Sequence, residues 1–483
     1  MLEQAQDGHA GLGLEPGSAR LLRERLARAV RDARREREPR LAAVCVPVPA
    51  ALDPAAVVLG ARRSEDRYFC LEQPDREGFA LAGLGEAARV EARGPDRFSE
   101  ATAHCRALAR GAHVGEPGND PTAPRASGPV WMGGFAFADH GGATPEWSSL
   151  APAQLVLPEV ALVRRAGVAR LTLCAVLDGD EDPDAVAGRL ERRLAELRPA
   201  AMPLLDPDPV DAPRVSAAAP AAHFEAAVAR AVERIRAGEL TKVVLAREVR
   251  VHASEPADPA AVLGVLREVF PACFCFLVGT PELAFLGASP ELLVRRDGLR
   301  AQTVALAGTT RRSADPSVDQ HLGEQLVRSA KNREEQAIVA RRIERALSPL
   351  SLWVAAADEP TLVRVHNVQH LATPIRAQLR EPRSVLELAG RLHPTPAVGG
   401  EPWERAAPLI PALEGLDRGW YAGPVGWTDL EEDGELCVAL RCAVLRGRVA
   451  HLYAGNGIVR DSIPAEELAE TEMKLGALLP LLS

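Results

Sequence analysis

The eight cysteines of this 483-residue chain include no Cys-x-x-Cys pair and no regular spacing. A disulfide framework or a cysteine-rich zinc site is therefore not expected, and buried free thiols in a reducing cytoplasm fit the pattern best. A long basic tract is also missing: the Arg-rich run 20–40 is interleaved with acids, and the net charge is −9. These features argue against nucleic acid as a partner.

Long apolar segments are absent as well. The most apolar stretch, 270–288, is interrupted by Pro271, Gly279, Pro281 and Glu282. It is too broken to span a membrane and is predicted to form a pair of strands. The first residues show no signal-peptide pattern. We therefore expect a cytoplasmic protein with no membrane partner.

Several well-known catalytic motifs do not occur. There is no G-x-x-x-x-G-K-[ST], no H-E-x-x-H and no G-x-S-x-G. Near matches to G-x-G-x-x-G start at Gly11, Gly83 and Gly455, but none of them opens a strand–helix unit of the required kind. Nucleotide-binding, zinc-protease and α/β-hydrolase chemistry are therefore disfavoured.

The length of the chain allows one large domain or two to three ordinary ones. Residues 41–177 alternate short β-like runs with turns, and segment 131–137 is rich in glycine and aromatic residues that suit close backbone approach and core packing. An amphipathic helix is expected over 19–37. The predicted organisation is a loose tail over 1–17, an N-terminal α+β portion over 18–198, a Pro/Ala-rich connection over 199–220 and a second α+β portion over 221–483.

Hydrophobic periodicity in the second portion predicts packed helices and antiparallel hairpins. The expected helices cover 221–237, 318–329, 333–347 and 384–392. The expected strands cover 241–251, 274–278, 284–288, 292–296, 299–305, 361–368 and 436–445. Asp297-Gly298 and Asp433-Gly434 are two-residue hairpin signals. The predicted fold class is α+β.

A charged helix face near the C-terminus is the first candidate for a functional site. It follows a predicted turn at 455–457, and Ser462 is the expected N-cap of the helix. Glu467, Glu470 and Lys474 lie at i, i+3 and i+7, so they share one face. Two carboxylates and an ammonium suit a hard cation held beside an anionic ligand. The plain alternative is a solvated helix surface with an ion pair between Glu470 and Lys474.

Four further charged residues stand in apolar company. Lys242 opens an apolar strand, where it either snorkels to the surface or, if desolvated, acts as a general base. Glu291 follows a tight turn and Glu335 lies on a helix; taken alone, each is an ordinary solvated acid. Arg441 lies among small residues of an expected strand, where a guanidinium needs an anion. Together these residues suit Mg²⁺-assisted chemistry on a small polyanion.

The motifs that contain these residues resemble those of the chorismate-utilising enzymes. The matching segments are LTKVVLARE, FLGASPELLVRR, ALAGTTRR, SAKNREEQ, VHNVQHLATPI, LHPTPAVGG, RGWYAGPVGW, ALRCAVL, YAGNGIVRDS and ELAETEMKL. They cover nearly all of 220–480, and WMGGFAF is similar to an N-terminal motif of the family. The resemblance implies an α+β fold of the aminodeoxychorismate synthase type, a large antiparallel sheet assembly with outer helices and a site in a cleft of the C-terminal half.

The resemblance also implies an activity, that of isochorismate synthase. This isomerase converts chorismate reversibly to isochorismate with Mg²⁺, by adding water at C2 while the C4 hydroxyl leaves. In this chain the resemblance implies Lys242 as the base that activates water and Glu291 as the acid that protonates the departing hydroxyl. It implies Glu335 and Glu470 as Mg²⁺ ligands, with Glu467 close by.

The substrate contacts follow from the same resemblance. The residues implied to hold the carboxylates are Tyr421, Arg441, the Gly457 backbone and Lys474. His370 and Ala397 are implied to line the ring. We expect chorismate as the small-molecule partner, a monomeric state and no obligate amidotransferase subunit.

Four alternatives remain open. Salicylate synthase shares the base and the acid, but it tends to carry threonine where this chain has Ala397. An aminodeoxychorismate synthase with a lysine nucleophile would need that lysine at Ala307, and an anthranilate synthase would lack Lys242. An inactive binding homologue would lack a residue of the site, and none is missing. Isochorismate synthase is preferred, with menaquinone, siderophore and salicylate synthesis as possible destinations of the product.

Overall fold

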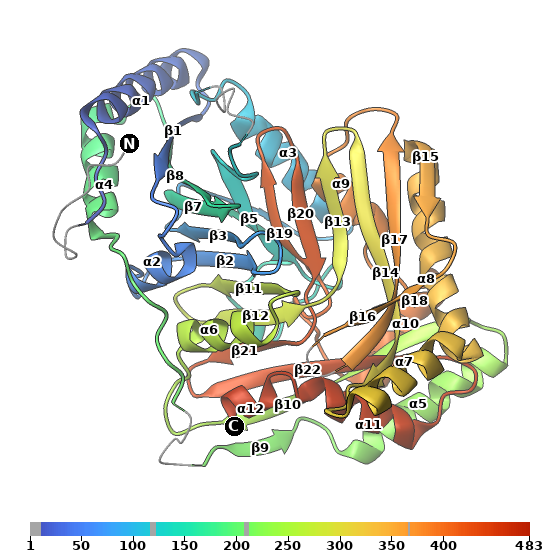
Figure 1. Ribbon diagram of the computed structural model, residues 1–483. Coiled ribbons are helices and arrows are strands. Elements are labelled where there is room, and N and C mark those ends of the chain that lie inside the picture. Colours follow the sequence, from blue (N-terminus) through green and yellow to red (C-terminus); the bar gives the residue numbers. More distant parts are fainter. Residues whose placement is uncertain (1–10, 116–121, 207–211, 366–367) are drawn as a thin grey trace.

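The computed structural model describes residues 11–115, 122–206, 212–365 and 368–483, and two large antiparallel sheets form its centre (Figure 1). In spatial order, the 12-stranded sheet contains β1 (Arg40–Val48), β8 (Val168–Leu177), β7 (Val160–Arg165), β3 (Phe79–Leu84), β2 (Tyr68–Gln73), β11 (Phe274–Gly279), β12 (Ala284–Ser289), β21 (Cys442–Arg446), β22 (Val449–Ile458), β10 (Lys242–His252) and β18 (Gly400–Glu401). A short strand, β9 (Arg214–Ala217), also pairs with β10.

The second sheet has ten strands. Its order is β15 (Ser351–Ala356), β17 (Val368–Leu379), β14 (Arg300–Arg311), β13 (Leu292–Asp297), β20 (Gly434–Val438), β19 (Pro424–Asp429), β5 (Val130–Phe135), β6 (Ala153–Leu157) and β4 (Ala88–Ala92). The tenth strand, β16 (Thr361–Arg364), pairs with β17. The antiparallel assembly expected from the family resemblance is therefore present.

Helices cover the outer sides of the sheets (Figure 1). They are α1 (Pro16–Glu36), α2 (Pro54–Gly60), α3 (Arg97–Ala109), α4 (Pro183–Glu196), α5 (Ala221–Arg236), α6 (Pro259–Val269), α7 (Pro316–Arg328), α8 (Ala330–Leu347), α9 (Val385–Leu392), α10 (Trp403–Glu414), α11 (Pro464–Leu475) and α12 (Leu479–Leu482). Two of them matter most for the site: α8 packs on β14 and β17, and α11 packs on α5 and β22.

Both sheets combine strands from the two predicted portions of the chain. In the first sheet β2 pairs with β11, and in the second β5 pairs with β19. The glycines of β5 make the second pairing tight, since a Cβ on Gly134 would lie 2.5 Å from the carbonyl oxygen of Pro424. The connection at 199–220 therefore does not separate two independent sheets.

Two of the points at which the chain passes from one sheet to the other are neighbours, at the same end of β13 and β20. β12 belongs to the first sheet and β13 to the second, and Pro290 and Glu291 link them. β20 belongs to the second sheet and β21 to the first, with residues 439–441 between them. These crossings are adjacent because β12 pairs with β21 and β13 pairs with β20. Glu291 and Arg441 thus lie at the junction of the two sheets.

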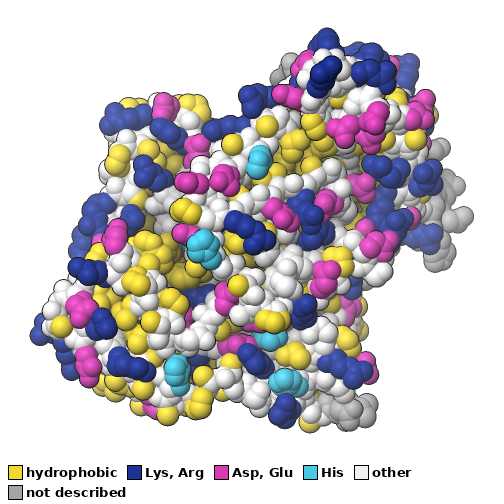
Figure 2. All heavy atoms as spheres, turned by 180° about the vertical axis from the view of Figure 1, so that it is seen from behind, with side chains coloured by type: hydrophobic (Ala, Val, Ile, Leu, Met, Phe, Trp, Pro, Cys, Tyr) yellow, Lys and Arg dark blue, Asp and Glu magenta, His cyan; other side chains and the backbone are white. Residues whose placement is uncertain are grey.

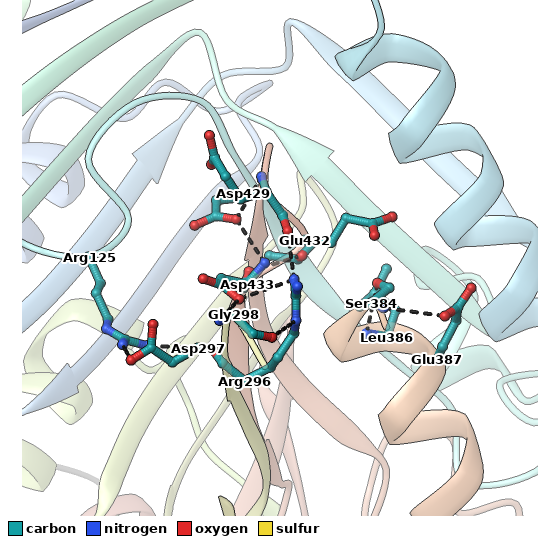
Figure 3. Close-up of polar contacts among 12 residues, drawn as sticks. Arg125, Arg296, Asp297, Gly298, Ser384, Leu386, Glu387, Asp429, Glu432 and Asp433 are labelled. Atoms are coloured by element: carbon teal, nitrogen blue, oxygen red, sulfur yellow. Dashed lines mark hydrogen bonds and ion pairs between the residues drawn. The ribbon is translucent and has the colours of Figure 1, made fainter. Parts of the chain in front are cut away.

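The hairpin tips at the other ends of β13 and β20 are joined by charged contacts (Figure 3). Arg296 pairs with Asp433 at 3.1 Å, and Asp433 accepts a hydrogen bond from the Gly298 N–H at 2.8 Å. Nearby, Ser384 and Glu387 form the capping box that begins α9. These contacts join the hairpin tips at the ends of β13 and β20 that lie away from Glu291 and Arg441.

Several predicted boundaries are wrong. The tail predicted over 1–17 is partly ordered, because α1 begins at Pro16 and the Leu12 N–H donates to the Leu197 carbonyl at 2.9 Å; residues 1–10 lie outside the described residues. The predicted connection contains β9. The strand predicted over 361–368 is two strands, β16 and β17, so His370 lies within a strand; residues 366–367 are not among those described.

The strand predicted over 436–445 is also two strands, because the chain changes sheets between β20 and β21. Arg441 has a φ of 47°, a left-handed conformation that breaks the alternation expected there. The turn predicted over 455–457 is extended backbone within β22. Ser462 is not the N-cap of α11; Ile463 occupies that position, and the Ser462 hydroxyl accepts from the Val459 N–H at 3.1 Å.

All eight cysteines are free, and seven are buried, while Cys45 is exposed. Within the described residues, no helix combines the length and apolarity needed to cross a membrane. On the face shown in Figure 2, basic and acidic side chains are interspersed, and the described residues there form no area of a single charge. That surface agrees with the mixed charge pattern of the sequence.

Candidate active site

A cavity at the junction of the two sheets gathers almost all of the predicted site residues. It encloses about 940 Å³ of empty space, part of it open to solvent. The predicted residues that line it are Glu291, Glu335, His370, Ala397, Tyr421, Arg441, Gly457, Glu467, Glu470 and Lys474. Lys242 is not part of the lining, but its Nζ lies 2.8 Å from Oε1 of Glu335. Side chains that are far apart in the sequence therefore meet at one place.

Lys242 is buried at the start of β10, with 1% of its surface exposed. Its side chain does not snorkel to the surface but ends at the Glu335 carboxylate. The neighbouring strand makes room for this pair, because a Cβ on Gly457 would lie 2.7 Å from Cε of Lys242 and 2.4 Å from Oε1 of Glu335. A buried ammonium needs a counter-charge, and here the predicted base finds it in a predicted metal ligand.

Glu291 lies where the chain crosses from β12 to β13, and it is 3% exposed. Its N–H donates to Oγ of Ser289 at 3.2 Å, and its carbonyl accepts from the Val438 N–H at 3.0 Å. Burial raises the pKa of the Glu291 carboxyl to about 8, against the opposing charges of Lys242 and Lys474. Glu291 is therefore protonated at neutral pH and can donate a proton.

Three lysine–carboxylate pairs surround the cavity. They are Lys242–Glu335 at 2.8 Å, Lys474–Glu470 at 2.8 Å and Lys331–Glu467 at 3.5 Å. The pair on α11 confirms the predicted contact between Glu470 and Lys474, but it faces the cavity and is not a solvated helix surface. Each carboxylate that the family resemblance links to a metal is thus already next to a positive charge.

Glu335, Glu467 and Glu470 offer carboxylate oxygens of the kind that a divalent cation binds. Burial raises the pKa of Glu467, and the neighbouring charges of Glu470 and Glu335 raise it further. Among the described residues, no three His, Cys, Asp or Glu side chains are already gathered around one ion position. All three glutamates nevertheless line the same cavity, and oxygen ligands of this kind suit a hard cation. The donor set therefore fits such an ion once the lysines exchange partners.

Arg441 places a buried guanidinium on the cavity wall, where it also interacts with the Cys273 side chain. Its Nη2 donates to Nε2 of His370 at 2.6 Å, while its buried Nη1 has no hydrogen-bond partner among the described residues. A buried guanidinium N–H without a partner is costly unless a ligand oxygen accepts from it. Arg441 is therefore ready to bind an anionic group.

The hydrogen bonds of His370 define its protonation. Its Nδ1 lies 3.3 Å from the Gly308 carbonyl oxygen, which can only accept, so Nδ1 carries the hydrogen and Nε2 accepts from Arg441. Burial lowers the pKa of His370 well below its usual range, and the charges of Arg441 and Lys474 lower it further. His370 is neutral and holds the arginine in place.

Lys474 and Tyr421, two of the remaining predicted substrate contacts, are held by hydrogen bonds to the backbone and by ring stacking. Nζ of Lys474 donates to the Gly455 carbonyl oxygen and to Oδ1 of Asn456, both at 2.9 Å. The Tyr421 ring stacks on Tyr453 with centroids 5.3 Å apart. These contacts hold a cation and an aromatic side chain on the wall formed by β22.

Some residues of the site were not predicted. The most important are Lys331, Asn332, Gly308, Thr309 and Asn456, all of which line the cavity or bond to residues that line it. Lys331 could have been found, because it lies four residues before Glu335 on the same helix and so shares its face. Asn456 could not, because its role depends on contacts to α11 that follow only from the fold.

Comparisons with known proteins agree with this geometry. A family model described as chorismate binding enzyme matches residues 26–483. The chain belongs to the chorismate-binding enzyme family. The enzyme is 38% identical over 412 residues to the salicylate biosynthesis isochorismate synthase of Pseudomonas aeruginosa, with 85% of this chain and 84% of the relative covered.

Other relatives of this chorismate-binding enzyme point the same way. Isochorismate synthase MenF of Bacillus subtilis is 33% identical over 437 residues, which cover 89% of this chain and 91% of the relative. The solved structure of MenF, the menaquinone-specific isochorismate synthase of Escherichia coli, is 29% identical and superposes with a TM-score of 0.76, covering 95% of this chain and all of that one. The family resemblance and the fold expected from it are confirmed.

Proposed function

We propose that this chorismate-binding enzyme is an isochorismate synthase, an isomerase that adds water at C2 of chorismate while the C4 hydroxyl leaves. The observation that carries the proposal is a protonated, buried Glu291 in a cavity that is also lined by Glu335, the partner of the buried Lys242. The reaction needs one group to take a proton and another to give one. Similarity to proteins named isochorismate synthase supports the same conclusion.

In the proposed mechanism, Lys242 removes a proton from water as the water oxygen bonds to C2. The ring double bonds shift, the C4–oxygen bond breaks, and Glu291 delivers its proton to the departing hydroxyl, which leaves as water. One water enters and one leaves. Lys242 must begin as the neutral amine; it ends with one more proton and Glu291 with one fewer, and return of that proton through solvent restores both groups, so atoms and charge balance. The reverse reaction uses the same two groups in exchanged roles.

We propose Mg²⁺ as the cofactor, held by Glu335 and Glu470 with Glu467 close by. When bound, the ion would supply positive charge for the ring carboxylate of chorismate. The three glutamates contribute acidic oxygens from two helices, α8 and α11. Loss of activity with EDTA and its recovery with added Mg²⁺ test this part of the proposal.

The substrate would be oriented by the opposite wall of the cavity. The unpaired Nη1 of Arg441 and the ammonium of Lys474 suit the other carboxylate, with Tyr421 and the Gly457 backbone beside them. The ring would lie against the residues proposed to line it, His370 and Ala397. We further propose that the enzyme works in the cytoplasm as a monomer. It needs no amidotransferase subunit, because water and not ammonia is its proposed nucleophile.

The rival functions differ at two positions of the cavity wall. Ala307 lies where a lysine nucleophile would be needed, and it presents only a methyl group to the cavity. Ala397, which also lines the cavity, is where salicylate synthases tend to carry threonine. These apolar positions favour isomerisation alone over amination or elimination of pyruvate.

The test is product identification after the purified enzyme meets chorismate and Mg²⁺, with and without an ammonium salt. We expect isochorismate in equilibrium with chorismate, in amounts that ammonium does not change. Salicylate with pyruvate would show that the wall at Ala397 permits elimination. An aminated product would overturn the role proposed for Lys242.

A further inference from the structure

Strand β10, which carries Lys242 at its start, has a gap along one edge. Its other edge pairs with β22 from Val243 to His252. On the gapped edge, β18 pairs only with Lys242 and Val243, and β9 pairs only from Val249 onward. Buried backbone N–H and C=O groups need hydrogen-bond partners, so the segment between β18 and β9 must find them elsewhere.

A buried ion pair takes the place of the missing strand. Nη2 of Arg418 donates to the Val244 carbonyl at 2.9 Å, and the Ala246 N–H donates to Oε1 of Glu414 at 2.7 Å. The two side chains also bind each other, with Nε of Arg418 donating to Oε2 of Glu414 at 3.0 Å. Both are almost completely buried, with 3% and 1% of the side chains exposed.

The same arginine reaches the neighbouring loop, in which Ala397 and Val398 line the cavity. Its Nη1 donates to the Val398 carbonyl at 2.8 Å, and the Val244 N–H donates to the neighbouring Gly399 carbonyl at 2.7 Å. The guanidinium carbon lies 4.2 Å from the centre of the Phe137 ring. Arg418 thus ties β10 to the loop containing Ala397.

Stability alone does not explain this arrangement. Burying both charges costs solvation energy, and replacing a buried ion pair by apolar side chains of similar volume is often neutral or stabilising. Here Arg418 donates to the carbonyl oxygens of Val244 and Val398, and both of those residues line the cavity. Glu414 accepts from the Ala246 N–H and holds Arg418 in place. Neither Glu414 nor Arg418 lines it.

We propose that Glu414 and Arg418 are positioning residues, which set the distance between Lys242 and the wall formed by Ala397. The inference rests on the proposed function of the cavity. A catalytic group displaced by about 1 Å can cost roughly 10²-fold in rate, so a strand edge without a neighbouring strand needs such a support. The pair acts on the reaction through Val244 and Val398.

The deciding variant is Glu414→Met together with Arg418→Met, which removes both charges and keeps the volume. We expect the melting temperature to fall, because the Ala246 N–H and the Val244 and Val398 carbonyls lose their partners. In the folded variant we expect kcat to fall at least tenfold and KM for chorismate to stay within about twofold. KM should hold because Arg441 and Lys474, the proposed carboxylate contacts, are not bonded to the pair. A purely structural pair would change Tm and leave kcat alone.

A matched control removes another buried ion pair outside the cavity. Arg193→Met with Asp66→Leu deletes a pair that joins α4 to the segment before β2, and neither residue lines the cavity. We expect this control to retain kcat. Wild-type kcat in the Glu414/Arg418 double variant, or an equal loss of kcat in the control, would overturn the positioning role.

A conservative variant decides the matter if the double variant does not fold. Arg418→Lys keeps the charge opposite Glu414 but cannot reach the two carbonyls and the carboxylate with one planar group. We expect a folded enzyme with kcat reduced several-fold, and wild-type kcat would overturn the proposal. If the wild-type enzyme formed another product from chorismate, the proposed function would fail. The kcat values of the wild type and the variants for that other product would still test whether Glu414 and Arg418 are positioning residues.

Discussion

At the scale of single residues, Glu291 shows how burial prepares a proton donor. Its carboxyl lies between the two sheets, and its pKa of about 8 keeps it protonated where an exposed glutamate would be ionised. The charges of Lys242 and Lys474 oppose this shift but do not cancel it. The acid of the proposed mechanism is therefore ready before substrate binds.

The activity should follow the protonation of Glu291. We expect kcat to fall about tenfold per pH unit above about pH 8, because the acid is then lost. A pH profile of kcat measures this, with Glu291→Gln as the comparison. A rate that stayed constant from pH 8 to pH 10 would assign the proton to another group.

The same group should make stability depend on pH. The folded pKa of Glu291 is raised from the reference value of 4.5 to about 8, so folding takes up a proton in this window. Its contribution to stability is complete below pH 4.5 and is lost as the pH rises toward 8. Urea unfolding gives the free energy of unfolding of the wild type and of Glu291→Gln at each pH from 5 to 8. We expect this free energy to change less with pH in the variant.

Lys242 is the residue whose loss should stop the reaction. We expect Lys242→Ala to lower kcat by roughly 10²–10⁴-fold, the usual size of a general-base contribution. Chorismate binding should change less, because the proposed carboxylate contacts, Arg441 and Lys474, remain. Steady-state kinetics and a direct binding measurement test this together, and near-normal turnover would remove Lys242 from the mechanism.

The residues of the site were predictable from the sequence, but their pairings were not. Motif resemblance identified Lys242 and Glu335 separately, as a base and a metal ligand. Their contact joins the start of β10 to α8, and nothing local in the sequence fixes which helix lies over which strand. The neutral state of His370 could not be predicted from the sequence either, because it depends on contacts with Arg441 and the Gly308 carbonyl.

At the scale of elements, two helices and the sheet crossings assemble the cavity. α8 presents Lys331 and Glu335, one helical turn apart, while α11 presents Glu467, Glu470 and Lys474. Each of the three glutamates is paired with a lysine. A cation that binds the glutamates must therefore compete with ammonium groups.

This competition makes a prediction for metal binding. We expect Lys331→Met to raise the affinity for Mg²⁺ several-fold, because Glu467 then has no neighbouring ammonium, and Glu470→Gln to lower it. Isothermal titration with Mg²⁺ alone gives the readout without turnover. Equal affinity in the wild type and both variants would show that these glutamates do not bind the ion.

Sequence patterns located most elements and failed at specific backbone features. The apolar run 436–445 was predicted as one strand because local alternation cannot show that the chain moves to the other sheet at Arg441. α10 was not predicted, since Pro408 and Pro411 lie inside it and proline disfavours a helix interior. The glycines of 455–457 suggest a turn, but they are needed for close approach to Lys242 and Tyr421.

At the scale of the whole molecule, the N-terminal portion completes both sheets. It supplies β2 beside β11 and β5 beside β19. The residues proposed to be catalytic all come from the C-terminal portion, yet the sheets that position them depend on these neighbours. Resemblance to the family predicted the antiparallel assembly, whereas the strand order could not be predicted because it depends on pairings between distant segments.

A shortened chain can show whether the C-terminal portion needs the N-terminal portion in order to fold. We expect residues 221–483 alone not to fold cooperatively, because β11 and β19 would each expose a buried edge. Circular dichroism during thermal unfolding, compared with the full chain, tests this. A sharp transition and chorismate turnover by the fragment would show that the C-terminal portion is self-sufficient.

The most direct test of the proposed reaction follows the oxygen of the solvent. Chorismate and Mg²⁺ are incubated with the enzyme in H₂¹⁸O, and isochorismate is analysed by mass spectrometry after a short reaction time. Water addition at C2 with loss of the C4 hydroxyl predicts one ¹⁸O atom, located at C2. Unlabelled isochorismate would mean that the hydroxyl moves within the substrate, and would contradict the roles proposed for Lys242 and Glu291.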